Sequence, residues 1–501
     1  MLSNLFDIPL LGALLKSRWT WRLLRLGALA LLLAMIAWGW KEHGIPGIKA
    51  GDALMYTNLT NHLFWVWWIM GVVIVALFFG RSWCAVCPLG WLNGLVTRIG
   101  LKRELPGWLK SYIPVTLALV ALQVVVYLFA IHRYPDLTAR LLALLVALAV
   151  GCGLLFRQRA FCMLLCPAGA VFGLYARLAP FELRVKQNGG CAACSDQSCV
   201  SGGSEWRRFS LGRGVFFWHS RRDDCPVDLV PEQIHDSHDC TLCLNCVHNC
   251  RNDSIRVGFR RWMADLGQSP LPAGEALFLV VLLGLLTANF SKVYIDLREA
   301  LLWPPQQAAL LLGWGGDGFN LLAAFWVALL LPVLMLLPAW AAWRLADLQV
   351  AALPATAAPD APTDPPRTEH GFWHRIGYLA LPIIPLLLAV HLVLAVVKIN
   401  AKAGYLPFAL RDPSGVKSFL AINVMHTLPG PGILIPLDIL KWIVLGLLAG
   451  GILVALSAAR RCAGQLPTDT SRRGYLLGAL LAIALPSAMY VATLIRWLFI
   501  R

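Results

Sequence analysis

The sequence predicts a polytopic α-helical membrane protein of about nine spans, with an inserted cytoplasmic two-cluster ferredoxin-like domain. Three observations lead to this fold class. Of the 501 residues, 58% are hydrophobic and only 14% are charged, which is typical of an integral membrane protein. The apolar residues fall in long runs. The 14 cysteines are too sparse for a disulfide scaffold, and their concentration in short stretches indicates metal sites.

Each apolar run is long enough to cross a bilayer, which requires about 20 apolar residues. Prolines inside some runs kink transmembrane helices without excluding them. The first run follows basic residues and has no small-residue cleavage site after it, so we interpret it as an uncleaved anchor. The predicted spans are 22–40, 62–80, 111–131, 138–156, 273–291, 318–342, 375–397, 436–457 and 475–497.

Basic residues give the predicted orientation. With the N-terminus in the cytoplasm, the segments on that side hold 30 of the 43 Lys and Arg residues, in agreement with the positive-inside rule. The net charge of +16 is therefore interpreted as a topology signal rather than as a sign of nucleic-acid binding. The predicted location is a bacterial cytoplasmic (inner) membrane, with the N-terminus and the ferredoxin-like domain inside.

The order of the predicted spans and the cysteine-rich segment divides the chain into three predicted domains. Residues 1–180 form a predicted N-terminal membrane domain with four spans, and residues 181–262 form the cytoplasmic domain. Residues 263–501 form a C-terminal membrane domain with five spans, in which the Ala- and Pro-rich stretch 349–370 is a predicted linker. The outer loop 398–435 is rich in Gly and Pro, and its composition fits a plain connector, a cover over the membrane face or a docking site.

The cytoplasmic domain holds eight cysteines within 60 residues. Its second half reads C-x2-C-x2-C-x3-C, in which three thiolates bind one cubane and the fourth binds a neighbouring one. Such tight nesting does not suit a single tetrahedral zinc, so iron–sulfur chemistry is favoured. The spacing predicts two 4Fe-4S clusters in a crossed pattern: Cys191, Cys194, Cys199 and Cys250 bind one, and Cys225, Cys240, Cys243 and Cys246 bind the other.

Two features depart from the usual two-cluster pattern. Arg251 follows Cys250 where proline is usual, although Pro226 does follow Cys225. In addition, the first half reads C-x2-C-x4-C and is followed by the insert 200–224, which interleaves five arginines with five aromatic residues. This composition fits an anionic membrane interface most simply. A docking surface for an acidic redox partner and a nucleic-acid surface are the other interpretations, and nucleic acid is not among the predicted partners.

An internal repeat precedes this domain. Residues 81–95 and 159–174 both read R-x-aromatic-C-x2/3-C-P-x-G-x3-G-L. Each copy follows a hairpin of two predicted spans, so a pseudo-two-fold axis along the membrane normal could bring their cysteines together. The interpretations left open are a bound cluster, another metal, a switchable dithiol pair, or free or disulfide-bonded thiols beside packing glycines. The four cysteines are Cys84, Cys87, Cys162 and Cys166.

Two histidines are candidate haem or quinone contacts. His391 lies inside a predicted span, where an ionisable side chain is a functional candidate. Haem normally requires a second axial ligand, for which His62 is the candidate, and haem is the less favoured of the two cofactors. A packing role also fits both histidines. Asp438 and Lys441 are predicted to form a structural pair at i, i+3, and Cys152 and Cys462 are predicted to be inert packing residues.

A hairpin-borne C-x2/3-C-P repeat followed by a two-cluster module resembles the membrane polyferredoxins of the NapH and NosR type, and the CcoG assembly proteins have similar motifs. The resemblance covers about residues 62–260. It implies a membrane-bound iron–sulfur electron-transfer protein of a respiratory chain, linking a cytoplasmic or quinone electron pool to a redox partner. Such a chain could be a component of a quinol-linked oxidoreductase. The alternative is a CcoG-like metal-handling or assembly factor for a respiratory metalloenzyme.

Overall fold

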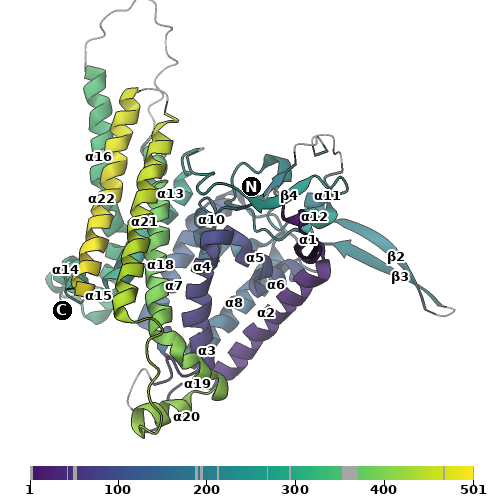
Figure 1. The fold of residues 1–501 in the computed structure, drawn as a ribbon, viewed down its shortest axis with the longest axis horizontal. Coiled ribbons are helices and arrows are strands. Elements are labelled where there is room, and N and C mark those ends of the chain that lie inside the picture. Colours follow the sequence, from purple (N-terminus) through teal and green to yellow (C-terminus); the bar gives the residue numbers. More distant parts are fainter. Residues whose placement is uncertain are drawn as a thin grey trace, which may run out of the picture.

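The protein is described by a computed structural model in which helices predominate (Figure 1). The predicted linker 349–370 lies outside the described residues, except for the end of one helix that reaches Ala352. The structure describes residues 4–41, 43–48, 53–186, 190–191, 194, 196–211, 214–267, 269–292, 295–352, 371–466 and 469–499.

Within these ranges, eight helices are long and apolar enough to cross a membrane. The predicted span 111–131 instead forms α7 (Ile113–Leu128), an apolar helix of 16 residues, which is shorter than the roughly 20 residues of a usual span. The multi-pass helical class is therefore supported, while the predicted count of nine is not confirmed. The eight helices are Arg18–Gly39, Leu59–Val96, Pro135–Leu155, Ala273–Ser291, Gly318–Leu348, Ile383–Arg411, Leu437–Ala463 and Arg472–Phe499.

Proline fixes the start of several helices. It occupies the first helical position of α6 (Pro88–Val96), α8 (Pro135–Leu155) and α10 (Pro167–Ala176). Its fixed φ suits the first turn, where its missing N–H has no partner to lose. Both C-P pairs of the repeat therefore stand at the start of a helix.

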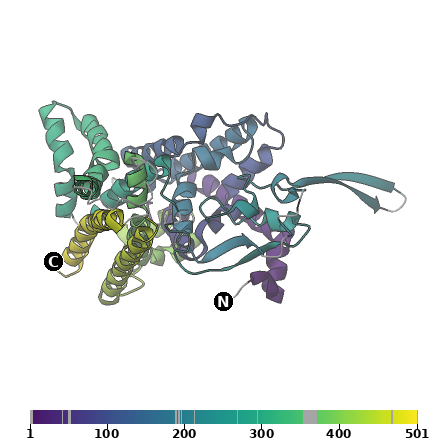
Figure 2. The same ribbon diagram turned by 90° about the horizontal axis from the view of Figure 1, so that it is seen from above.

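The helices of the two predicted membrane domains pack side by side along α4 (Ile69–Phe79) and α18 (Ile383–Lys402) (Figures 1 and 2). One buried core runs through both domains and includes Val72 of the first and Phe278 of the second. Small residues allow close helix approach: a Cβ on Gly478 would lie 2.7 Å from the Ala339 carbonyl oxygen. The C-terminal bundle contains α13 (Ala273–Ser291), α16 (Leu331–Ala352), α18, α21 (Leu437–Ala463) and α22 (Asp469–Phe499).

The outer loop folds over one end of the spans. It contains α19 (Leu406–Arg411) and α20 (Val416–Phe419), between which the Asp412 carboxylate accepts the Ser418 N–H at 2.8 Å. Asn58 of the N-terminal domain donates to the Ser414 carbonyl at 3.1 Å. The loop is therefore an ordered cover joining the two domains rather than a plain connector, and a docking role stays a prediction.

The cysteine-rich domain, called the module below (residues 181–262), lies at the end of the spans where α2 (Arg18–Gly39) begins (Figure 1). Its first strand, β1 (Phe181–Val185), pairs antiparallel with its last, β4 (Ile255–Phe259). Leu183 and Val257 of these strands are buried in a small core shared with the cysteine loops. Two short helices, α11 (Ser198–Ser201) and α12 (Asn245–Asn249), each carry a cysteine.

The basic and aromatic insert forms a two-stranded antiparallel ribbon. β2 (Gly203–Leu211) pairs with β3 (Gly214–Arg222), and the register places Arg207 opposite Trp218. Figures 1 and 2 show the ribbon extending sideways from the body. The side chains of 203–222 lie outside the described part of the structure, so the predicted membrane or partner contact of the insert remains a prediction.

The remaining elements connect these parts. α14 and α15 form a helical pair beside the C-terminal bundle. Of three π-helical segments among the described residues, two lie within longer helices and the third follows α20. The bounds are α1 (Pro9–Lys16), α3 (Leu59–Asn61), α5 (Trp83–Val86), α9 (Ala160–Leu164), α14 (Ile295–Leu311), α15 (Gly316–Phe325), α17 (Phe372–Ala380), and the π-helical segments His62–Trp68, Trp326–Leu330 and Leu420–Val424.

Candidate functional site

The two copies of the repeat meet at the end of the spans below the module. Cys84 lies in α5 and Cys162 in α9, whereas Cys87 and Cys166 occupy the N-cap positions of α6 and α10. Cys162 is close enough to the other three thiols to interact electrostatically with each of them. The fold thus brings together these four thiols, which we call the repeat tetrad.

Arginines interlock the two copies. Arg159 of the second copy donates from Nη1 to the Cys84 carbonyl of the first at 3.2 Å. A Cβ on Gly90 would lie 3.4 Å from this same Nη1 and 3.2 Å from the Cys162 sulfur. The symmetric contact is present in the other copy, where a Cβ on Gly169 would lie 3.4 Å from Nη2 of Arg81. Each glycine therefore leaves space for the arginine of the opposite copy.

The surroundings of the tetrad fit a thiolate-bound cluster. Burial raises the pKa of the Cys166 thiol to about 12, and the nearby Cys87 and Cys84 raise it further. A free thiol here is protonated at neutral pH, whereas a coordinated thiol is deprotonated. Arg81 is only 7% exposed, and its Nε has no hydrogen-bond partner among the described residues. The buried positive charge of Arg81 is stabilised by a negatively charged centre, whereas four neutral thiols would not offset it.

The eight module cysteines separate into two groups. Cys199 interacts electrostatically with Cys191, Cys250 and Cys194, in that order of strength. Cys246 interacts most strongly with Cys243, Cys240 and Cys225. The crossed pattern groups the cysteines into the same two sets, and their role as cluster ligands stays a prediction. We call them the distal quartet (Cys191, Cys194, Cys199, Cys250) and the proximal quartet (Cys225, Cys240, Cys243, Cys246).

The proximal quartet lines an open pocket, whose empty space of about 340 Å³ includes solvent at the mouth. Leu183 and Ile234 are among the apolar side chains that line the rest of it. Burial raises the pKa of Cys225 to about 12 and that of Cys240 to about 11, so these thiols also require a bound centre to become thiolates at neutral pH. Among the described residues, no three His, Cys, Asp or Glu side chains are grouped closely enough to hold a single metal ion.

The two halves of the module have the same local conformation around their fourth cysteines. Leu229 donates its backbone N–H to the Cys225 sulfur at 3.3 Å, and Ser254 donates to the Cys250 sulfur at the same distance. In both halves, an aspartate three residues after the cysteine has a positive φ, 52° at Asp228 and 45° at Asp253. The replacement of the usual proline after Cys250 therefore leaves the geometry of this fourth cysteine unchanged.

The third cysteine of each half is presented in the same way. Gln197 and Leu244 have left-handed φ values of 42° and 58°, and each caps a short helix whose second residue is Cys199 or Cys246. A non-glycine residue in this conformation costs about 1–2 kcal/mol and persists only where the surrounding structure imposes it. The backbone strain at Gln197 and Leu244 therefore lies at the two turns that position Cys199 and Cys246.

Two buried arginines join the tetrad to the module. Arg81 donates from Nη1 to the His238 carbonyl at 2.9 Å and lies 3.9 Å from the Asp239 carboxylate, next to Cys240. Arg25 donates from Nε to the Ala85 carbonyl at 2.8 Å. Neither arginine has a role that the cysteine spacing predicts. The repeated motif that begins with Arg81 is the signal that could have identified it, while no sequence signal distinguishes Arg25 from its neighbours.

A second buried network fastens the module to the membrane helices. The Tyr112 hydroxyl lies 2.7 Å from Nε2 of His238. Arg177 pairs with Glu275 of α13 at 2.9 Å and with Asp236 of the module at 3.2 Å. Because these groups are charged or polar and mostly buried, their mutual contacts fix the position of the module on the spans. The sequence analysis did not identify this network, since its members lie far apart in the chain.

We expect Gly173→Ala to loosen the contact between α10 and the module. An added Cβ would lie 2.9 Å from the His238 ring and 3.1 Å from its backbone oxygen, so the stability should fall by about 1–3 kcal/mol. Thermal unfolding of the purified chain in detergent measures this loss. Gly94→Ala is the matched control from the other copy of the repeat, because its nearest neighbour would lie at 3.8 Å. Equal effects of the two substitutions would contradict this role for Gly173.

The candidate histidines each have a protein partner. Nδ1 of His391 lies 3.0 Å from the hydroxyl of Tyr175, which is on α10 after Cys166. Nε2 of His62 accepts from the Trp67 indole N–H at 3.1 Å. His391 is thus connected to the helix of the tetrad, while the haem and quinone roles stay predictions.

The predicted pair Asp438–Lys441 is present at 3.1 Å, and Cys152 and Cys462 both pack in hydrophobic cores.

Fold and site together define a multi-helix, membrane-type iron–sulfur protein. A family described as "4Fe-4S binding domain" matches residues 61–106 and 139–186, which contain the two copies of the repeat. The chain is 23% identical to the "Putative electron transport protein YccM" of Escherichia coli, over 36% of this chain and 52% of that protein. These similarities support an iron–sulfur electron-transport family, but they do not confirm the finer NapH and NosR type.

Two archaeal relatives match a similar portion of the chain. The uncharacterized protein MJ0749 of Methanocaldococcus jannaschii is 23% identical over 41% of this chain and 72% of that protein. The uncharacterized protein MJ0750 of the same organism is 22% identical over 38% of this chain and 76% of that protein. No solved structure matches the chain. The comparisons therefore associate 4Fe-4S binding with the repeat itself, where the sequence analysis left several interpretations open.

Proposed function

We propose that the chain is a membrane-bound electron carrier with three 4Fe-4S clusters, held by the distal quartet, the proximal quartet and the repeat tetrad in that order. The observation that carries this proposal is the contiguity of the three thiol groups. Cys246 of the proximal quartet interacts electrostatically with Cys199 of the distal quartet. Arg81 interacts with Cys84 and Cys162 of the tetrad and hydrogen-bonds beside Cys240. The proximal quartet therefore lies between the other two.

A cluster at each group supplies one-electron redox chemistry, and the protein residues set its conditions. The N–H groups of Leu229 and Ser254 donate to cysteine sulfurs, which favours the more negative, reduced state. Arg81 and Arg25 place positive charge beside the tetrad and the proximal quartet, and so offset the charge of an added electron. The apolar pocket around the proximal quartet limits access of water.

The proposed electron path runs between a soluble redox partner at the module and a partner reached from the membrane domain. The module is the proposed cytoplasmic side, in a bacterial inner membrane, because the surrounding segments are rich in Lys and Arg. His391 is a proposed quinone contact, since its partner Tyr175 lies on the helix that follows Cys166. A quinone bound there would connect the tetrad to the membrane electron pool.

Iron and acid-labile sulfide analysis of the full chain, purified without oxygen, tests the proposal. We expect about twelve iron atoms and about twelve sulfides per chain. About eight iron atoms would remove the tetrad cluster from the proposal, and fewer than about eight would also reject the two module clusters. Copper bound by the tetrad in place of iron would instead favour the metal-handling alternative.

A further inference from the structure

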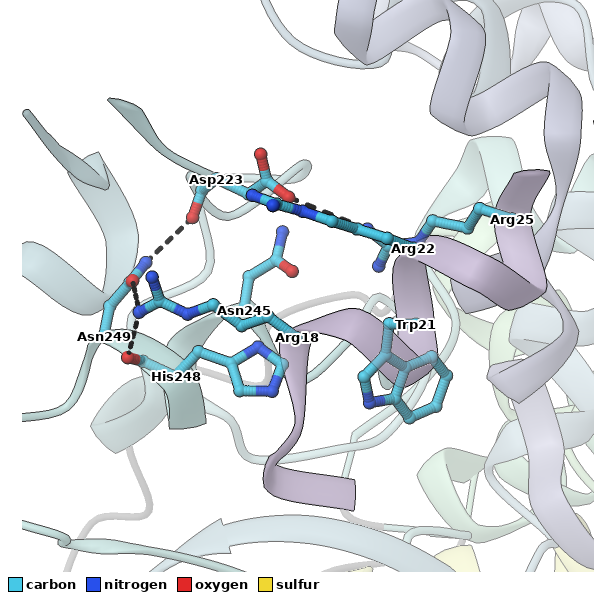
Figure 3. Close-up of a pocket in the computed structure, with 8 residues that line it drawn as sticks. All are labelled: Arg18, Trp21, Arg22, Arg25, Asp223, Asn245, His248 and Asn249. Atoms are coloured by element: carbon cyan, nitrogen blue, oxygen red, sulfur yellow. Dashed lines mark hydrogen bonds and ion pairs between the residues drawn. The ribbon is translucent and has the colours of Figure 1, made fainter. Parts of the chain in front are cut away.

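A second pocket lies between α2 and the module, and none of the cluster cysteines lines it (Figure 3). It is open to the surface, and its empty space of about 340 Å³ includes solvent at the mouth. One wall comes from the first two turns of α2, and the other comes from α12 and from the residue that follows β3. The lining residues are Arg18, Trp21, Arg22 and Arg25 on the first wall, and Asp223, Asn245, His248 and Asn249 on the second.

The pocket has an excess of positive charge. It contains three arginines but only one carboxylate, Asp223, which is shared between Arg25 at 3.7 Å and Arg98 outside the pocket. Arg18 is held across the pocket, where its Nη2 donates to the His248 carbonyl at 2.7 Å (Figure 3). Arg22 is exposed and stacks over the Trp19 ring at 5.5 Å. The arrangement therefore favours an anionic ligand.

Arg25 provides an independent indication of a ligand. It lines the pocket and is only 2% exposed, yet its Nη2 atom has no hydrogen-bond partner among the described residues. A buried donor of a charged group that lacks an acceptor costs about 1–3 kcal/mol or more. An anion in the pocket would offset the positive charge of this buried guanidinium group, which lines it.

We propose that this pocket binds a phosphate group through Arg18, Arg22 and Arg25. Guanidinium groups present paired N–H donors that match phosphate oxygens, and three of them converge here. The group can come from the headgroup of an anionic phospholipid or from free phosphate. The lipid source is accessible, because α2 is a candidate membrane span and Trp19 on its surface is 68% exposed, as expected at a membrane interface.

The occupant would also connect the membrane surface to the proximal quartet. Asn245 and His248 of the pocket wall flank Cys246 on α12. A bound phosphate would therefore fix the position of the helix that presents this cysteine. This binding is independent of the proposed electron path, because it requires only the folded chain.

The test is ligand binding to the delipidated full-length chain in detergent. Native mass spectrometry with added phosphatidylglycerol or phosphatidylcholine measures lipid binding, and equilibrium dialysis measures binding of inorganic phosphate. Arg22→Gln should weaken binding of the phosphate ligand about tenfold, since it removes a charge-assisted pair, and the exposed position of Arg22 makes the substitution mild for the fold. Lys110→Gln is the matched control, because Lys110 is exposed and does not line the pocket.

The outcomes separate the two sources of phosphate. Phosphatidylglycerol binding that depends on Arg22 and is not displaced by inorganic phosphate would identify the lipid headgroup, whereas Arg22-dependent binding of inorganic phosphate would identify the free anion. Binding of neither probe, or equal binding by the Arg22→Gln chain, would overturn the proposal. Arg22-dependent binding of polyglutamate without phosphate binding would also overturn it, in favour of an acidic protein partner.

Discussion

Cys166→Ala is expected to lower the iron content from about twelve to about eight atoms per chain, because three thiolates remain where a cubane needs four. The side chain lies in the repeat tetrad, where burial raises the pKa of its thiol to about 12. The two module clusters should keep their paramagnetic signals, since their cysteines belong to separate groups. Iron analysis and electron paramagnetic resonance of the purified variant measure both results.

Cys152→Ala is the matched control for this substitution. Cys152 is a half-buried thiol on α8 that packs in a hydrophobic core and is not part of the tetrad. We expect its iron content to equal that of the unmodified chain. An unchanged iron content in Cys166→Ala, or an equal loss in Cys152→Ala, would show that the tetrad does not hold a cluster.

Cys225→Ala is expected to remove the same paramagnetic signal as Cys240→Ala, with a loss of about four iron atoms in each case. Both cysteines belong to the proximal quartet, although 14 residues separate them. Cys250→Ala should instead remove the signal that Cys191→Ala removes, because those two belong to the distal quartet. Spectra of the four single variants measure which signal each cysteine supports.

An uncrossed arrangement would give the opposite pairing. Cys225 would then share a signal with Cys191, and Cys250 would share one with Cys240. That result would contradict the grouping in which Cys250 lies near Cys199 and Cys225 lies near Cys246. Each variant also serves as a control for the others, since all four remove a single thiol from the same small domain.

Cysteine spacing predicted the module because the ligand pattern is largely local. The run from Cys240 to Cys250 predicts three thiols around one centre and a fourth at the next, and the fold places Cys246 near Cys240 and Cys243. The repeat likewise indicated that Cys84 and Cys162 would meet, because two similar hairpins pack about a common axis. These parts of the site can be predicted because they depend mainly on local spacing and on a short sequence repeat, not on contacts between distant segments.

Other parts depend on contacts between distant segments and were not predictable. Arg159 begins the second copy of the repeated motif, but the sequence does not show that its side chain reaches the Cys84 carbonyl of the first copy. The pairing of Arg177 with Glu275 joins residues nearly 100 positions apart. The length of α7 was overestimated because hydropathy does not show where a helix ends. Tertiary packing determines all three features.

Electron paramagnetic resonance of the fully reduced, unmodified chain tests the central claim most directly. Three neighbouring clusters should interact magnetically, so the account predicts a broadened spectrum that simplifies when Cys166→Ala removes the tetrad cluster and simplifies further when Cys225→Ala removes the proximal one. A spectrum of the unmodified chain equal to the sum of isolated centres, or one with no third centre, would contradict an electron path from the module through the proximal quartet to the tetrad.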